Sequence, residues 1–312
     1  MKQTGIKIFI VLVLLAGFVT GNAGGQSFPP VPYEPVTTIR SISRSRYQTT
    51  VNDYTFTARD GRTIKLFYSF PVNVTSDTQL LFVMHGVGRN AEGYINTYQY
   101  LPETENIIVI VPEFALEQFP SEDYQRIGIS ANINAPENWM PKIIDDIFLN
   151  FTRRFNLRIS KYILFGHSAG AQFTHRSVMF SESNYMDYAI AANAGSYTFV
   201  NMQDVNFRWG VKDVLPRHRD LINRNFGRRL YILIGDKDND PNAADFTRSA
   251  TADRQGITRY ERALNFYQVS RDYCTQNNLP FNWELIVMGG VAHSSSNSRP
   301  YVIDIITGKY KH

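Results

Sequence analysis

The sequence predicts an α/β domain with a mostly parallel sheet of about eight strands, helices on both faces and an antiparallel hairpin at its start. Three observations support this prediction: six nearly continuous apolar runs, helical patterns between them, and a hairpin pattern before them. The apolar runs are residues 80–84, 107–111, 162–165, 188–192, 230–234 and 285–288. Continuous apolarity is typical of parallel strands that are covered on both faces.

The hairpin is predicted from residues 54–57, which alternate between polar and apolar, and residues 64–68, with an Asp-Gly turn between them. Residues 140–154 carry apolar side chains at three-and-four spacing, which predicts an amphipathic helix. Residues 257–277 show a similar pattern, so we expect a second long helix there.

Two irregular insertions interrupt this alternation, at residues 112–138 and 196–225. Loops of this length in a compact domain commonly form the lids or walls of a functional site. The sequence therefore predicts a single catalytic domain over residues 49–312 that carries two lid-like insertions.

The N-terminus has the pattern of an export signal. Two lysines precede an apolar or glycine run over residues 8–19, and small residues follow, with a candidate cleavage site after Ala23. We expect a signal peptide over residues 1–23, an extended linker or strap over residues 24–48, and a secreted or periplasmic protein. A bilayer span needs ~20 apolar residues, so no stable membrane span is expected after cleavage. The alternative is a protein tethered to a membrane by an uncleaved N-terminal segment.

The composition excludes several classes of protein. The chain has 312 residues, 43% of them hydrophobic and 19% charged, which argues against disorder and against a coiled coil. Its net charge of +4 is small and dispersed, so no nucleic-acid partner is expected. The single cysteine, Cys274, can form no intramolecular disulfide. We expect no cofactor.

Residues 166–170 read Gly-His-Ser-Ala-Gly and are the most informative motif of the chain. They lie between the apolar run at 162–165 and a helix-like stretch at 172–179. A G-x-S-x-G motif between a strand and a helix is the nucleophile elbow, in which a sharp turn exposes the serine. Ser168 is therefore the candidate nucleophile.

Three other strand ends carry the groups that a nucleophilic serine requires. His-Gly-Val-Gly follows the first parallel run at residues 85–88, Gly-Asp-Lys-Asp-Asn-Asp stands at 235–240, and Gly-Gly-Val-Ala-His stands at 289–293. Ligands bind at the carboxyl ends of parallel strands, so these segments can converge. The order of glycine loop, serine, aspartate and histidine is that of an α/β-hydrolase.

The base and the acid follow from these positions. Of the six histidines, only His293 follows the last strand in a Gly/Ser loop, so it is the candidate general base. Asp238 is the preferred acid, because the acid usually stands three residues after the strand's glycine. Asp240 is the alternative. A calcium loop is a weaker interpretation of these aspartates, since the glycine and the distal glutamate of an EF-hand are missing.

A tetrahedral intermediate would need two backbone N–H donors for its oxyanion. The Ala169 N–H at the start of the elbow helix is one candidate, and the Val87 N–H of the glycine loop is the other. We expect His85 to brace that loop. A zinc site built from His85 and His167 would lack a third ligand with natural spacing, so no metal site is predicted.

With these motifs the chain resembles the secreted α/β-hydrolases of the poly(3-hydroxybutyrate) depolymerase-like and feruloyl/acetylxylan esterase group. The resemblance covers roughly residues 80–306 and depends on the segments at 85–91, 166–173, 192–197 and 290–293. It implies a serine carboxylester hydrolase whose triad is Ser168, Asp238 and His293.

Members of that group usually carry disulfides and often a separate polymer-binding domain. This chain has one cysteine and no room for such a domain, so we expect a soluble short-chain or carbohydrate-linked ester as the substrate. If the protein is an enzyme of another kind, the alternative is an exopeptidase-type serine hydrolase. If it is not an enzyme, the alternative is a catalytically silent binding module with the same fold. The insertions offer aromatic side chains for the walls of the site, whose ordinary role would be packing: Phe114, Phe119, Tyr124, Tyr197, Phe199 and Trp209.

Overall fold

The computed structural model describes residues 50–310. The predicted signal peptide, the linker and the possible membrane tether lie outside these residues. Within the described part of the chain, no helix is both long enough and apolar enough to cross a membrane.

An eight-stranded sheet forms the centre of the domain, in the order β1-β2-β4-β3-β5-β6-β7-β8. The pairings of β1 with β2 and of β2 with β4 are antiparallel, and all later pairings are parallel. The strands are β1 (Asn52–Thr57), β2 (Thr63–Ser69), β3 (Gln79–Met84), β4 (Ile107–Glu113), β5 (Tyr162–His167), β6 (Met186–Ala192), β7 (Arg229–Gly235) and β8 (Trp283–Met288). The predicted α/β-hydrolase fold, with its opening hairpin and parallel sheet, is confirmed.

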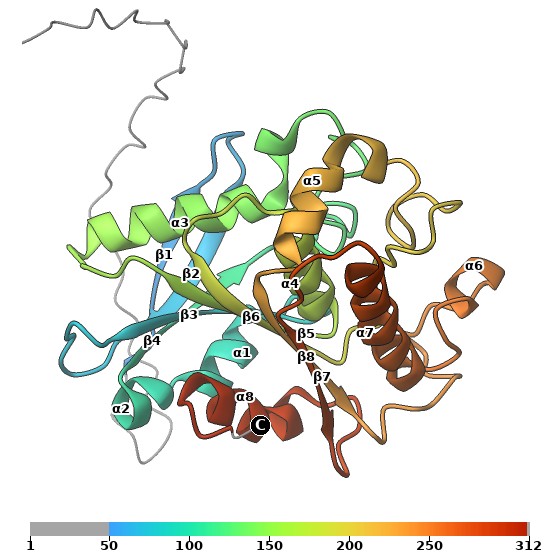
Figure 1. Cartoon of the computed structure of the whole chain (residues 1–312). Coiled ribbons are helices and arrows are strands. Elements are labelled where there is room, and N and C mark those ends of the chain that lie inside the picture. Colours follow the sequence, from blue (N-terminus) through green and yellow to red (C-terminus); the bar gives the residue numbers. More distant parts are fainter. Residues whose placement is uncertain (1–49, 311–312) are drawn as a thin grey trace, which may run out of the picture. The chain divides into compact units, whose positions relative to one another are not determined.

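Helices cover both faces of the sheet (Figure 1). One face carries α3 (Met140–Arg154), α4 (Ala169–Phe180), α5 (Leu215–Asn225) and α7 (Arg259–Gln276). The other face carries α1 (Ala91–Tyr98), α2 (Leu101–Glu105) and α8 (Ser295–Ile306). The remaining pieces are the 3₁₀ turn η1 (Pro136–Asn138) and the short α6 (Ala250–Asp253).

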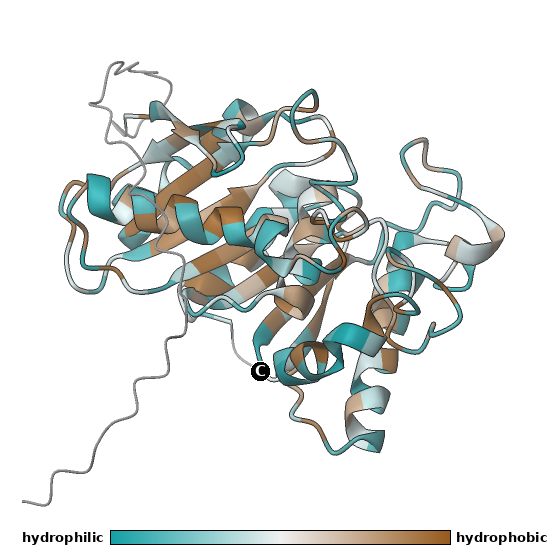
Figure 2. Ribbon diagram, turned by 90° about the horizontal axis from the view of Figure 1, so that it is seen from above, coloured by the Kyte–Doolittle hydropathy of each residue, from teal (hydrophilic) through white to brown (hydrophobic). Residues whose placement is uncertain are grey.

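The apolar runs of the sequence are continuous because both faces of each strand are buried. Along β3, Leu80, Phe82 and Met84 pack on the α3/α4 side, whereas Leu81 and Val83 pack on the α1/α8 side. Figure 2 shows the same arrangement, with hydrophobic strands between helices whose outer surfaces are hydrophilic. Burial of this apolar surface is the main force that holds the layers together.

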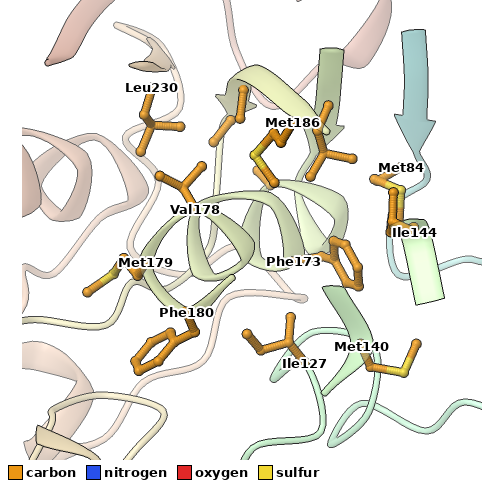
Figure 3. Packing of buried hydrophobic residues seen from close by; sticks show 14 of the residues in the cluster. Met84, Ile127, Met140, Ile144, Phe173, Val178, Met179, Phe180, Met186 and Leu230 are labelled. Atoms are coloured by element: carbon orange, nitrogen blue, oxygen red, sulfur yellow. The ribbon is translucent and has the colours of Figure 1, made fainter. Parts of the chain in front are cut away.

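Helix α4 lies at the centre of the larger core. Every residue of α4 except Gln172 is buried. Figure 3 shows its Phe173, Val178, Met179 and Phe180 among hydrophobic side chains from other elements. A helix enclosed in this way has little freedom to move, so the turn at its N-terminus is held in a fixed position.

The two insertions are packed into the domain through their aromatic side chains. Five of the six candidate wall residues are buried, namely Phe114, Phe119, Tyr124, Tyr197 and Phe199. The sixth, Trp209, is partly exposed and lies against the guanidinium groups of Arg208 and Arg262. Packing is thus the observed role of these aromatic rings.

Arg176 of α4 joins both insertions to the core. Its side chain is fully buried and donates a hydrogen bond to the Gln125 carbonyl at 2.6 Å in one insertion. In the other insertion it donates to Ser196 Oγ at 3.1 Å and Thr198 Oγ1 at 3.1 Å. These acceptors are neutral, so the guanidinium serves to satisfy buried oxygens that would otherwise lack donors.

We expect Arg176→Met to destabilise the domain by about 2 kcal/mol or more, because it leaves several buried oxygens without donors. Denaturant unfolding would measure the change. Arg219→Met, which removes an exposed arginine from α5, is the matched control and should change the unfolding free energy little. Equal stability of the two variants would contradict this role of Arg176.

Candidate active site

Ser168 occupies a strained turn between β5 and α4. Its backbone has φ 56° and ψ −113°, a conformation that side-chain-bearing residues rarely adopt. The glycines of the motif make the turn possible. A Cβ on Gly166 would lie 2.5 Å from Thr174 Oγ1, and one on Gly170 would lie 2.8 Å from the His85 carbonyl oxygen. The sequence therefore needs glycine at both places, as the elbow interpretation predicts.

Ser168, His293 and Asp238 form a continuous hydrogen-bonded series. The His293 Nε2 atom lies 3.0 Å from Ser168 Oγ, and its Nδ1 atom lies 2.7 Å from Asp238 Oδ2. Asp238 is buried, with 4% of its side chain exposed, whereas His293 is 24% exposed. The buried carboxylate thus accepts from Nδ1–H, which leaves Nε2 free to accept the serine proton.

The other two aspartates of the loop after β7 have different partners. Asp240 is exposed, and its Oδ1 accepts a hydrogen bond from the Asn242 N–H at 2.8 Å. Asp236 Oδ1 accepts from the Gly290 N–H at 2.8 Å. Asp240 and Asp236 therefore shape the two loops, and Asp238 is the aspartate of this trio that contacts His293.

Asn193, at the end of β6, ties the acid loop to the histidine loop. Its buried side chain accepts from the Gly235 N–H at 2.9 Å and donates to the Ala292 carbonyl at 3.3 Å. Its backbone has φ 54°, a conformation that asparagine tolerates better than most residues. This bridge holds the loop of His293 at the carboxyl end of the sheet.

The glycine loop after β3 lies beside the elbow, since Gly170 packs directly against Met84 and His85. Val87 is 52% exposed. Ala169 is buried and begins α4, and N–H groups in the first turn of a helix lack intrahelical acceptors. Ala169 directly follows Ser168, and the glycine loop that carries Val87 lies beside the elbow, so the N–H groups of both residues stay candidate donors to an oxyanion.

His85 braces the glycine loop, as expected. Its Nε2 accepts from the Phe114 N–H at 3.1 Å, and its backbone carbonyl accepts from Tyr124 Oη at 2.7 Å. Burial lowers the pKa of His85 to about 4, so its side chain is neutral at pH 7.

His167 lies behind the His293 ring, with ring centroids 5.0 Å apart. Burial, with a smaller contribution from His293, lowers the pKa of His167 to about 3. Its ring is therefore neutral at pH 7 and adds no charge beside the triad.

Two charged residues of the site were not predicted from the sequence. Arg259, the first residue of α7, lies 3.4 Å from Asp238 Oδ1 and 2.6 Å from Asp245 Oδ1. Asp245 Oδ2 in turn lies 3.9 Å from His293 Nε2. No motif marks either residue, because their role depends on how α7 and the loop after β7 meet in space.

The described residues offer no metal site: across residues 50–310, no group of three or more His, Cys, Asp or Glu side chains could hold an ion.

The sequence is matched by no protein-family model and by no curated protein.

Solved structures do resemble this chain. Poly(aspartic acid) hydrolase-1 from Sphingomonas sp. KT-1 is 31% identical, with a TM-score of 0.77 over 82% of this chain and 98% of that chain. LpqC, a poly(3-hydroxybutyrate) depolymerase from Bordetella parapertussis, is 25% identical, with a TM-score of 0.76 over 84% of this chain and 91% of that chain. The siderophore hydrolase EstA from Aspergillus nidulans shares the fold at 12% identity, with a TM-score of 0.53 over 88% of this chain and 100% of that chain.

The fold and these likenesses define the class: the chain is an esterase-like hydrolase of the α/β-hydrolase fold. Within that class, it belongs to the family that includes poly(aspartic acid) hydrolase-1.

Proposed function

We propose that the chain is an exported serine hydrolase that cleaves carboxylic esters through an acyl-enzyme intermediate. The observation that carries the proposal is the hydrogen-bonded series from Ser168 through His293 to Asp238, with Ser168 at a strained elbow. The export part depends on the sequence of residues 1–23 alone.

The geometry supports the following course of reaction. Ser168 Oγ attacks the acyl carbon while His293 Nε2 takes the hydroxyl proton, and Asp238 stabilises the resulting imidazolium. The Val87 and Ala169 N–H groups donate to the oxyanion of the tetrahedral intermediate. The intermediate collapses as His293 returns the proton to the leaving alcohol, and water then hydrolyses the acyl-enzyme by the same steps.

The names of the similar proteins support hydrolysis of an acyl bond, and they suggest two kinds of substrate bond, an ester and an amide. The depolymerase name of LpqC refers to a polyester, which supports an ester substrate. The name of poly(aspartic acid) hydrolase-1 refers to a polyamide, which makes amide hydrolysis the second candidate. Esters are the first choice, because resonance stabilises an ester carbonyl less than an amide carbonyl and an alkoxide leaves more readily than an amide anion.

A substrate panel tests the proposal. It would contain acyl esters of rising chain length, acetylated and feruloylated sugars, and the amide counterpart of each ester. We expect kcat/KM to be highest for soluble esters. The Ser168→Ala variant, which lacks the proposed nucleophile, gives the background rate. Cleavage of the amides alone would replace the ester proposal with the amide one. Absence of turnover for every compound would favour the silent binding module.

A further inference from the structure

Asp245 places a second carboxylate on the reactive side of His293. Its Oδ2 lies 3.9 Å from His293 Nε2, the nitrogen that faces Ser168 Oγ. The carboxylate of Asp238 lies on the opposite edge of the ring, at Nδ1. The two acids are therefore not equivalent: one orients the imidazole, and the other lies beside the atom that exchanges the proton.

Arg259 holds Asp245 in this place. Its guanidinium is nearly buried, with 2% of the side chain exposed, and it lies 2.6 Å from Asp245 Oδ1. It also contacts Asp238 at 3.4 Å and packs over the Phe246 ring at 4.9 Å from the centroid. Because Arg259 is fixed on three sides, it is a rigid anchor for a side chain that is itself half-exposed.

The charges of this cluster do not cancel. Two carboxylates, Asp238 and Asp245, face one guanidinium, Arg259, so the cluster carries one net negative charge while His293 is neutral. Partial burial works to raise the pKa of Asp245, but the charge and the hydrogen bond of Arg259 hold it below its ordinary value. The carboxylate is thus ionised at neutral pH. Since 48% of the Asp245 side chain is exposed, its charge faces the open side of the site.

The position of Asp245 determines which part of a substrate meets it. Nε2 delivers its proton to the oxygen of the leaving alcohol, so that alcohol must pass close to Nε2. A carboxylate oxygen 3.9 Å from the same nitrogen lies within reach of the first atoms of the alcohol. Charges on the alcohol will therefore interact with Asp245 at short range, where solvent screening is incomplete.

We propose that Asp245, anchored by Arg259, is a specificity-determining residue that favours esters with a cationic or neutral alcohol and disfavours esters with an anionic alcohol. This inference rests on the proposed ester hydrolysis. It assigns Asp245 no part in proton transfer.

Three esters test the inference directly. They share one acyl group and differ in the alcohol, which carries a quaternary ammonium, a tert-butyl or a sulfonate group. For the unchanged protein we expect kcat/KM to fall in that order. In Asp245→Asn, the ratio of the cationic to the anionic ester should fall by about fivefold. The preference of the unchanged protein should also weaken in about 1 M salt, where the Debye length is about 3 Å.

Asp240→Asn is the matched control, because it removes the same charge from an exposed site of the same loop whose carboxylate faces Asn242. The Asp240→Asn variant should keep the preference of the unchanged protein. Asp245→Glu, which has the carboxylate that Asp245→Asn lacks, should show that preference too. An equal change of the ratio in Asp240→Asn and Asp245→Asn, or no change in either, would overturn the assignment. Turnover of the neutral ester tests the proposed function separately, since it does not depend on the charge of the alcohol.

Discussion

Ser168→Ala is expected to lower kcat on a soluble ester by about a millionfold, the scale of loss seen when a serine hydrolase loses its nucleophile. The hydroxyl that forms the acyl-enzyme is gone, and His293 has no proton to accept from this position. Steady-state kinetics with a chromogenic ester, in protein prepared free of the unchanged enzyme, would measure the loss. Residual activity of more than a small fraction would show that another group is the nucleophile.

The strain at the elbow supplies a control for folding. Ser168 has φ 56°, and alanine would keep that strain, whereas glycine would relieve it. Both variants should be inactive, but Ser168→Gly should be the more stable of the two, by about 1 kcal/mol. Denaturant unfolding would compare them. Inactivity in a protein of unchanged or higher stability cannot be attributed to misfolding.

Asp238→Asn should lower kcat by about ten-thousandfold, because an amide at this position favours the wrong tautomer of His293 and no longer stabilises the imidazolium. The buried position of the carboxylate and its 2.7 Å contact with Nδ1 make this the second-largest effect that we expect. The kinetic measurement is the same as for Ser168→Ala.

Asp240→Asn is the control for the acid, since it changes the neighbouring aspartate whose side chain caps the turn at Asn242. Its kcat should stay close to that of the unchanged protein. The reverse pattern, with activity kept in Asp238→Asn and lost in Asp240→Asn, would move the role of the acid to Asp240.

The elements of the fold could be predicted because each leaves a local pattern. The helix expected over residues 140–154 coincides with α3, since its apolar spacing faces one core. The strands could be recognised because each is buried on both faces, which leaves a continuous apolar run. Ser168 and its glycines were recognisable for a different reason: the turn tolerates few other residues at these positions.

Some features of the site could not be predicted because they depend on tertiary contacts. Arg259 and Asp245 become neighbours of His293 only when α7 packs beside the loop after β7. Arg176 likewise hydrogen-bonds to both insertions from the centre of the core, and no local sequence pattern marks these long-range contacts. The sequence pattern favoured Asp238 and kept Asp240 as the alternative, and in the structure the path of their loop brings Asp238 to His293 and Asp240 to the Asn242 N–H.

Labelling with a fluorophosphonate tests most directly whether Ser168 is an activated nucleophile. The reagent reacts with a serine only when a nearby base removes the hydroxyl proton, as His293 is placed to do. We expect peptide mass spectrometry of the folded protein to find one covalent adduct, located on Ser168, and none in the Ser168→Ala variant. A folded protein that carries no adduct, or carries it on another residue, would contradict the proposed function.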